Sequence, residues 1–289
     1  MNMGNDAPKE NAPLLREHRD KTATEVDIER RWRQVLLEGG STESFQQAYD
    51  ELHAEFLDRL GDGEEIYDEV NPRSDVDDRL RAVILRYVGS NVRVLEVGTG
   101  DGMTAYLLAR QGNKVRSVDV SRIALDRARA RWGDEPGLDL CFAYGDARKL
   151  DLPDGSVDFV VSENMVEHIS LADMRIHLAE VRRVLAPGGG YLLYTPSRLW
   201  SGRVSAGLHL HVYTLHELCT MMREYGLRPI WLEPRLLHRT GRLVGMSGFG
   251  LRLAWLWESL LSLLRVHTWP PALKARILPS IMVCGRLDA

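Results

Sequence analysis

The chain has 289 residues, of which 44% are hydrophobic and 27% charged, a balance typical of a globular protein with one full-sized domain plus additions. Its formal net charge of −4 argues against a general nucleic-acid binder, which is usually basic. The N-terminus lacks the apolar core of a signal peptide, and no run of roughly 18 apolar residues predicts a transmembrane helix. The three cysteines form no CxxC pair and lie in apolar runs, so we expect small core residues, no disulfide and a cytoplasmic location.

The N-terminal part is expected to cap a larger domain. Residues 1–21 are polar and predict a disordered lead. Helical spacing of apolar residues then predicts a helical cap over residues 22–88, with helices at 24–37, 42–60 and 76–88. Tyr49 and Tyr67 are candidates to close over a ligand, although each is also suited to packing within the cap.

After residue 89, strands alternate with helices. The predicted strands cover 93–97, 114–118, 138–143, 157–162, 191–194, 228–233 and 280–286. Helices are expected between them, at 104–111, 122–132, 172–185 and 214–225. This alternation predicts one α/β domain over residues 89–289, built as a doubly wound, Rossmann-like sheet of seven mostly parallel strands. Residues 236–278 are expected to form a helical insertion before the last strand.

A glycine-rich loop follows the first of these strands, in the run Val94-Leu95-Glu96-Val97-Gly98-Thr99-Gly100-Asp101-Gly102. Glycines allow a tight turn and let a ligand lie against the main chain. Such a string alone is also found in ordinary turns between a strand and a helix. The setting is more specific, because Asp119 ends the next strand, where an acidic residue meets ribose hydroxyls, and Asp146 follows the third strand, where a carboxylate can accept from an adenine amino group.

The loop differs from a dinucleotide-binding fingerprint in spacing and in charge. Its third glycine comes one residue earlier than in GxGxxG. Glu96 and Asp101 would repel a pyrophosphate, but they suit a ligand that carries an ammonium and a sulfonium charge. The sequence therefore favours S-adenosylmethionine (SAM) over a nicotinamide dinucleotide.

Five motifs in this order resemble those of class I SAM-dependent methyltransferases. Residues 94–102 are similar to their first motif, 117–121 to the second-strand motif, 145–147 to the adenine-contacting motif and 184–189 to the turn before the fifth strand. Residues 157–168 resemble the fourth-strand motif of the subgroup typified by ubiquinone and menaquinone biosynthesis, the methyltransferase type 11-like proteins. Residues 211–218 resemble a later segment of small-molecule members.

The resemblance implies roles for individual residues in holding SAM. It assigns cofactor binding to the following residues of this chain: Glu96, Gly98, Thr99, Gly100, Asp101, Gly102, Asp119, Val120, Asp146, Ala147 and Glu163. In this scheme the loop shapes the methionine end, Asp119 takes the ribose and Asp146 with Ala147 takes the adenine. Glu163 departs from the family pattern, in which this residue is usually apolar, so its carboxylate could instead face the acceptor.

Histidines near the expected acceptor site are the candidates for catalysis. Methyl transfer depends strongly on positioning, and an alcohol or phenol acceptor also gains from a base. His168 follows the fourth strand and His211 follows the fifth, so both are candidates, with anchoring of the next helix as the alternative for His168. His209 and His211 form an His-x-His pair, but no carboxylate lies beside them in sequence, so we expect no metal site.

Residues 249–266 form a very apolar segment with a narrow polar stripe. Such a helix can pack on the core over the acceptor pocket, form a homodimer face or lie on a membrane surface, which would make the protein peripheral to the membrane. Flanking Arg239, Arg242, Lys274 and Arg276 are compatible with anionic lipid.

The sequence as a whole predicts an enzyme that transfers a methyl group to a small molecule. The expected acceptor atom is an oxygen of a lipid-like, quinone, polyketide or sugar-bearing metabolite, and nucleic acid is not an expected partner. The alternatives are an RNA or protein methyltransferase, or a non-catalytic SAM-binding or scaffold protein. The acidic overall charge counts against RNA.

Overall fold

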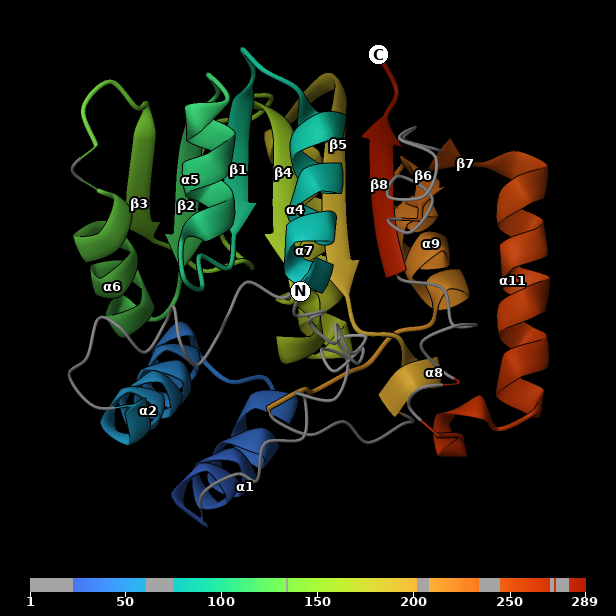
Figure 1. The fold of residues 1–289 in the computed structure, drawn as a ribbon, viewed down its shortest axis with the longest axis horizontal. Helices are drawn as coiled ribbons and strands as arrows, with labels where there is room; N and C mark the ends of the chain where they lie inside the picture. Colours follow the sequence, from blue (N-terminus) through green and yellow to red (C-terminus); the bar gives the residue numbers. More distant parts are fainter. Residues whose placement is uncertain are drawn as a thin grey trace, which may run out of the picture.

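The computed structural model describes residues 23–60, 75–133, 135–201, 208–233, 245–270, 273 and 281–289. Its centre is a mixed sheet with helices on both faces (Figure 1). The predicted lead over residues 1–21 and Tyr67 lie outside the described residues. No helix of the described part of the chain is long and apolar enough to cross a membrane.

The sheet has the strand order β3-β2-β1-β4-β5-β8-β6-β7. Its strands are β1 (Arg93–Val97), β2 (Lys114–Asp119), β3 (Leu140–Tyr144), β4 (Val157–Glu163), β5 (Leu185–Thr195), β6 (Leu227–Leu232), β7 (Gly245–Met246) and β8 (Ile281–Leu287). Neighbours among the first five strands are parallel, and β8 runs antiparallel to both β5 and β6.

The predicted count of seven strands is wrong by one. The additional strand, β7, pairs only Met246 with Trp231 and Gly245 with Leu232 at the edge of the sheet. Two residues are too few to produce a visible alternation of polar and apolar side chains, so this strand could not be predicted from the sequence. Cys141 is also exposed, against expectation, because β3 is the opposite edge strand, whereas Cys219 and Cys284 are buried.

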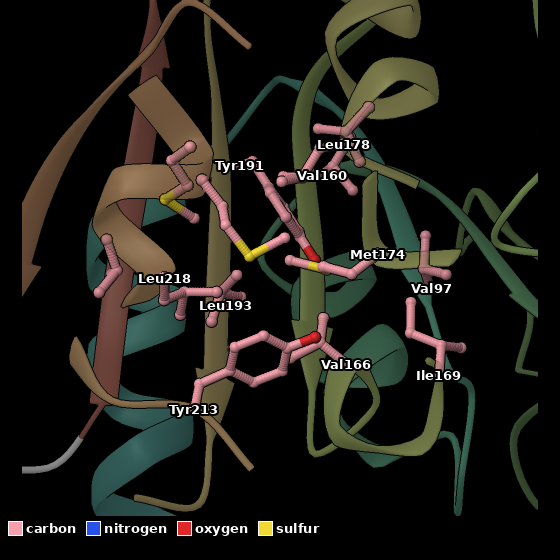
Figure 2. Close-up of a cluster of buried hydrophobic side chains, with 14 of the residues drawn as sticks. Val97, Val160, Val166, Ile169, Met174, Leu178, Tyr191, Leu193, Tyr213 and Leu218 are labelled. Carbon is pink, nitrogen blue, oxygen red and sulfur yellow. The ribbon is translucent and has the colours of Figure 1, made fainter. Parts of the chain in front are cut away.

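Helices cover the two faces of the sheet in separate layers. One face carries α4 (Asp75–Val88), α5 (Met103–Arg110) and α6 (Arg122–Trp132), and the other carries α7 (Leu171–Val184) and α9 (Leu215–Glu224). Strand residues alternate between the two cores, so that Leu192 packs with the first layer and Leu193 with the second. Figure 2 shows the second core, in which Val97 and Ile169 lie at one end.

Side-chain caps fix where several of these helices begin. Ser121 accepts a hydrogen bond from Ala124 N at the start of α6, and Ser170 does the same from Asp173 N at the start of α7. Thr214 and Glu217 form a capping box at the start of α9. Each cap satisfies backbone donors that would otherwise lack partners at a partly buried helix end.

Two groups of helices lie outside the α/β layers. Helices α1 (Ala23–Leu37) and α2 (Thr42–Leu60) lie beyond the carboxyl ends of the first strands (Figure 1). Leu36, Phe45 and Ala48 of this cap are buried in the second core. Helix α11 (Gly248–Leu263) lies past β6 and β7, near the short helix α8 (Arg198–Ser201) and the 3-10 turn η3 (Val266–Thr268).

Candidate cofactor and acceptor site

A cavity of about 180 Å³ lies at the carboxyl ends of β1, β2 and β4. Its walls come from α2, the glycine loop, the end of β2, the loop after β3, the end of β4 and the 3-10 turn η2 (Val166–His168). Open α/β sheets bind ligands at this edge. A larger depression of about 360 Å³ lies at the opposite edge, around Asn91 and Lys114, and contains none of the motif residues.

The cavity brings together most of the residues expected from the sequence. Those that line it are Gly98, Gly100, Asp119, Val120, Asp146, Ala147, Glu163 and His168. The expected residues that are not part of its lining are Glu96, Thr99, Asp101, Gly102 and His211.

The three glycines of the loop have different roles. Gly98, Gly100 and Gly102 all adopt positive φ angles, of 91°, 52° and 75°, which favour glycine. A Cβ on Gly102 would lie 2.9 Å from both Ala128 and Trp132, so this glycine allows α5 to begin against α6. A Cβ on Gly100 would meet nothing within 4 Å, because this residue faces open space at the cavity. The loop therefore leaves room for a ligand at Gly100 and serves packing at Gly102.

Asp119 stands at the end of β2 with its carboxylate fixed by backbone donors. Oδ1 accepts a hydrogen bond from Ser121 N at 2.8 Å, and Oδ2 accepts a long one from Gly100 N at 3.4 Å. Burial raises the pKa of Asp119, while the Ser121 N–H and nearby His53 oppose that rise. The side chain is positioned without help from a strong cationic partner, which leaves it able to accept from the hydroxyls of a ribose.

Asp146 is held much more tightly than Asp119. Arg148 donates from Nη2 to Oδ2 at 2.8 Å and from Nε to Oδ1 at 3.0 Å, and Thr42 of α2 donates to Oδ2 at 2.5 Å. Burial alone would raise the pKa of Asp146, but the hydrogen bonds from Arg148 and Thr42 outweigh burial and hold it below its usual value. The carboxylate therefore also fastens α2 to the loop after β3.

Two acidic residues of the first motif support the loop from outside the cavity. Glu96 is 2% exposed and accepts a hydrogen bond from Ser117 Oγ at 2.5 Å, and Ser117 Oγ lies 2.7 Å from Thr99 Oγ1. Burial raises the pKa of Glu96 well above its usual value. Asp101 accepts from Met103 N at 3.0 Å at the start of α5.

Glu163 is the carboxylate that lies in the cavity wall beside the glycine loop. Its Oε2 accepts a hydrogen bond from Thr104 Oγ1 at 2.8 Å, and Thr104 in turn receives one from Arg81 Nε at 3.3 Å. Arg81 also lies 3.8 Å from Asp101. Asp119 and Glu163 thus contribute carboxylates to the wall of the cavity, and Asp101 lies outside the wall beside Arg81. This concentration of negative charge suits a cationic ligand.

Helix α2 closes the cavity on the side away from the sheet. Phe45, Tyr49 and His53 line it from one face of this helix. Asp50 accepts from Ser121 Oγ at 2.7 Å, and His53 Nδ1 lies 2.9 Å from the same oxygen. Since the hydroxyl proton of Ser121 points to Asp50, His53 is the donor in the second bond. These contacts join the cap to the N-terminus of α6.

His168 lies at the far end of the cavity, in η2. Its Nδ1 lies 3.2 Å from Leu208 O and must carry the proton, since a carbonyl only accepts. The ring packs edge-on against Tyr49, with centroids 5.6 Å apart, and against His209, at 4.8 Å. Burial and the neighbouring His209 lower the pKa of His168 to about 3. The unprotonated Nε2 is therefore available as a proton acceptor across the neutral pH range.

Glu167, His168 and His209 form a group that sequence spacing did not reveal. One ligand atom from each lies within 4.8 Å of the other two. Tetrahedral zinc with bonds of about 2.1 Å needs its ligand atoms about 3.4 Å apart. Glu167 Oε2 already accepts from Thr195 Oγ1 at 2.9 Å. These three side chains would have to move closer together to bind a divalent ion. The expectation that the protein has no metal site therefore stays a prediction.

His211 lies away from the cavity. Its Nε2 is 2.8 Å from Glu217 Oε1, and its ring packs against Tyr213 at a centroid distance of 4.6 Å. Glu217 belongs to the capping box of α9 and also binds Arg198. These contacts give His211 an anchoring position next to α9, and they do not support its expected catalytic role.

Several residues of the site were missed by sequence reasoning. They are Phe45, His53, Arg148, Asn164, Met165 and Ile169. Asn164 has a φ of 50°, which a residue with a side chain adopts rarely. An Asn directly after a buried strand was the available signal for that turn. Phe45 and His53 belong to α2, and Met165 and Ile169 flank η2, so their places depend on how these elements pack on the sheet, while Arg148 lies in the loop after β3 and contacts α2 through Phe45.

Comparison with known proteins agrees with this geometry. Residues 94–189 match a family described as a methyltransferase domain. A probable S-adenosylmethionine-dependent methyltransferase of Mycolicibacterium smegmatis is 39% identical over 106 residues, which are 37% of this chain and 38% of that protein. The EEF1A lysine methyltransferase 4 of Mus musculus is 29% identical over 155 residues, which are 43% of this chain and 60% of that protein.

A solved structure shows the same fold. The YcgJ protein from Bacillus subtilis superposes with a TM-score of 0.50 at 18% identity, over 72% of this chain and 98% of that one. The sequence match spans less than half the length of the Mycolicibacterium relative. The strand order and this superposition show a Rossmann-like fold with a cavity at the carboxyl ends of its parallel strands. Residues 94–189 of this chain therefore form a methyltransferase domain, and the relatives similar to it are described as SAM-dependent methyltransferases, for which SAM is the cofactor.

Proposed function

We propose that this chain transfers a methyl group from SAM to a small-molecule acceptor, at an oxygen of a lipid-like, quinone, polyketide or sugar-bearing metabolite. The observation that carries the proposal is the cavity at the carboxyl ends of β1, β2 and β4, which α2 covers and which carboxylates border. It combines acidic residues, Asp119, Asp146 and Glu163, with apolar side chains and a histidine, His168.

The residues present fit SAM. Gly100 leaves open space where a ligand can lie against the main chain, and Asp119 offers its carboxylate to ribose hydroxyls. Asp146 and Ala147 border the place expected for adenine, although Arg148 and Thr42 already occupy much of the hydrogen-bonding capacity of Asp146. Glu163 and Asp101 supply negative charge towards the methionine end. When bound, SAM supplies a methyl group activated by a sulfonium.

The acceptor end of the cavity is formed by Tyr49, Met165, His168 and Ile169. Its mostly apolar character favours a greasy or aromatic acceptor over a charged one. His168 accepts the proton of an acceptor hydroxyl through Nε2, because Nδ1 is committed to Leu208 O. A low pKa makes His168 a weak base, so most of the rate enhancement comes from holding the acceptor in line and excluding water.

A macromolecular acceptor is the main alternative. The similarity to a protein described as a lysine methyltransferase supports this alternative. Against it, α2 is attached over the cavity by the contacts of Asp50 and His53 with Ser121, and its side chains Phe45 and Tyr49 give the cavity apolar walls that suit a small molecule. A net charge of −4 also disfavours RNA. The remaining alternative is a protein that binds SAM without catalysing methyl transfer. Such a protein would have the same cavity, but it would form no methylated product.

Two measurements separate these functions. Calorimetry with SAM should show binding, and NAD should not compete; a preference for NAD would refute the assignment of the cofactor. Labelled SAM is then incubated with a cell extract divided into small-molecule, RNA and protein fractions. We expect label in the small-molecule fraction. Label confined to RNA or protein would refute the small-molecule acceptor, and SAM binding without label in any fraction would favour the non-catalytic alternative.

A further inference from the structure

Helix α11 presents apolar side chains on two opposite faces. One face carries Leu251, Ala254 and Leu261, which are buried against the protein. The other carries Phe249, Leu253, Leu256, Leu260 and Leu263, here named the α11 stripe. Exposure reaches 74% for Phe249, 67% for Leu256 and 80% for Leu263. Other exposed apolar residues in the described part of the chain, such as Leu37 and Ile176, lie elsewhere and reach at most 48% exposure, whereas the α11 stripe gathers several on one helix, which marks an interaction site.

The α11 stripe forms one continuous line along the helix. Its members are spaced by four, three, four and three residues, which places them on the same side of the helix. The 16 residues of α11 make a rod about 24 Å long. Trp257 and Leu264, which are also exposed, widen the stripe on one side, and Arg252 borders it on the other. A linear apolar surface with a cationic border is suited to contact with an extended partner surface, and it does not enclose a small ligand as a pocket would.

The buried face of α11 is fixed to the domain by Glu258. Its carboxylate accepts hydrogen bonds from Leu215 N at 2.6 Å and His216 N at 3.0 Å at the start of α9. Glu258 is 3% exposed, so it contributes no charge to the outer surface of the helix. The helix is therefore held with its stripe facing outwards, at the end of the molecule beyond β6 and β7 (Figure 1).

Charge identifies the kind of surface that would cover this stripe. From residue 234 to residue 280 the sequence contains seven Lys or Arg and one carboxylate, Glu258, although the whole chain has a net charge of −4. Within the described part of this segment, Arg252 and Arg265 are exposed. An apolar helical stripe bordered by arginines, with its single carboxylate turned inwards, is the pattern of a helix that lies in the interface of an anionic bilayer.

We propose that the α11 stripe docks this protein on the surface of a membrane that contains anionic phospholipid. Leu256, Leu260 and Leu263 enter the boundary between headgroups and acyl chains, and Arg252 and Arg265 contact lipid phosphates. A second copy of the chain is a less favourable occupant, because two α11 stripes packed about a twofold axis would bring arginines together with no exposed carboxylate on either helix to pair with them. The proposal does not depend on methyl transfer.

Vesicle flotation of the full chain tests this docking. Vesicles of phosphatidylcholine alone are compared with vesicles of phosphatidylcholine and phosphatidylglycerol. We expect flotation with the anionic vesicles, weaker flotation with the neutral ones, and a decrease as salt is raised. The double variant Leu256→Ser/Leu263→Ser should lower the partition coefficient by roughly tenfold or more, because two exposed leucines no longer enter the bilayer.

The matched control is Ile176→Ser, which removes an apolar side chain of 48% exposure from α7 and should float like the wild type. SAM calorimetry on each variant shows that the domain remains folded and separates a failure of docking from a failure of the proposed function. No flotation of the wild type, or equal flotation of the double variant, would overturn the proposal. So would a dimer in sedimentation that the double variant dissociates, since a second copy would then occupy the stripe.

Discussion

The carboxylate of Asp146 is paired with the guanidinium of Arg148, with Nη2 and Oδ2 2.8 Å apart, while both side chains are less than 15% exposed. Arg148 also donates to Gly40 O at 2.6 Å, and Thr42 donates to the same carboxylate. The residue expected to contact adenine is therefore also the point at which the cap is fastened to the domain. Its contribution to stability can be measured separately from its contribution to cofactor binding.

Replacing Asp146 should destabilise the fold in a pH-dependent way. Because the folded-state pKa of Asp146 is lowered, its stabilising effect is present above the ordinary carboxyl pKa of about 3.9 and is lost as pH falls through the lower folded value. We expect Asp146→Asn to cost about 1–3 kcal/mol from pH 5 to 8, and the difference from the wild type to shrink below about pH 4. Urea unfolding over a pH series measures this.

The control is Asp154→Asn. Asp154 also pairs with an arginine, Arg183, but its side chain is 80% exposed, so the loss should be within about 0.5 kcal/mol. Equal effects of the two substitutions would show that the Asp146–Arg148 pair does not fasten the cap.

Replacing Asp119 should weaken SAM binding without unfolding the protein. Removal of its carboxylate deletes the acceptor proposed for two ribose hydroxyls, at about 1–2 kcal/mol each, so Asp119→Ala should raise Kd roughly 30-fold to several hundredfold. Calorimetry measures the affinity. Asp126→Ala on the exposed side of α6 is the control and should bind SAM normally. If Asp119→Ala binds SAM with unchanged affinity, Asp119 does not bind the ribose.

Replacing His168 should affect turnover more than binding. With the acceptor identified by the labelled-methyl screen, we expect His168→Ala to lower kcat about 100-fold and to change SAM affinity little. Because the pKa of His168 is about 3, its ring is already neutral above pH 5, and the wild-type kcat should show no inflection near pH 6.5 that belongs to this residue.

His267→Ala, in the exposed turn η3, is the control for loss of an imidazole. A kcat of His168→Ala equal to that of the wild type would assign His168 to anchoring the 208–211 segment instead of catalysis.

Replacing Glu258 should loosen α11. Glu258→Ala removes the acceptor for Leu215 N and His216 N and leaves the start of α9 without that charge, so we expect a loss of about 2–4 kcal/mol in unfolding free energy. Chemical denaturation provides the value. Ser259→Ala, the exposed neighbour on the same helix, should change stability by less than about 0.5 kcal/mol. If both variants unfold alike, Glu258 does not hold α11 in place.

Most of the fold was predictable because local patterns specify it. The periodicity of apolar residues placed α1 and α2 within one residue of their observed ends, and the cap at Thr214 correctly marked the start of α9. The two-residue strand β7 was not predictable, since its pairing with β6 depends on a neighbour and not on its own composition. The same holds for the site. Asp119 and Gly100 lie within short motifs, whereas His53 reaches the site only because α2 packs over it.

The glycine loop and Asp119 could be placed from the sequence, because they are close along the chain and lie at the ends of adjacent parallel strands, and their roles in binding SAM stay a prediction. The groups that each side chain meets could not be read from the sequence, because they depend on how distant segments pack together. The tertiary structure paired Asp146 with Arg148, brought Glu167 and His168 against His209, and moved His211 out of the cavity. The orientation of α11 also came from the tertiary structure. The helix is apolar over most of its circumference in sequence, and the face with Leu251, Leu261 and the hydrogen-bonded Glu258 is the one that packs on the protein.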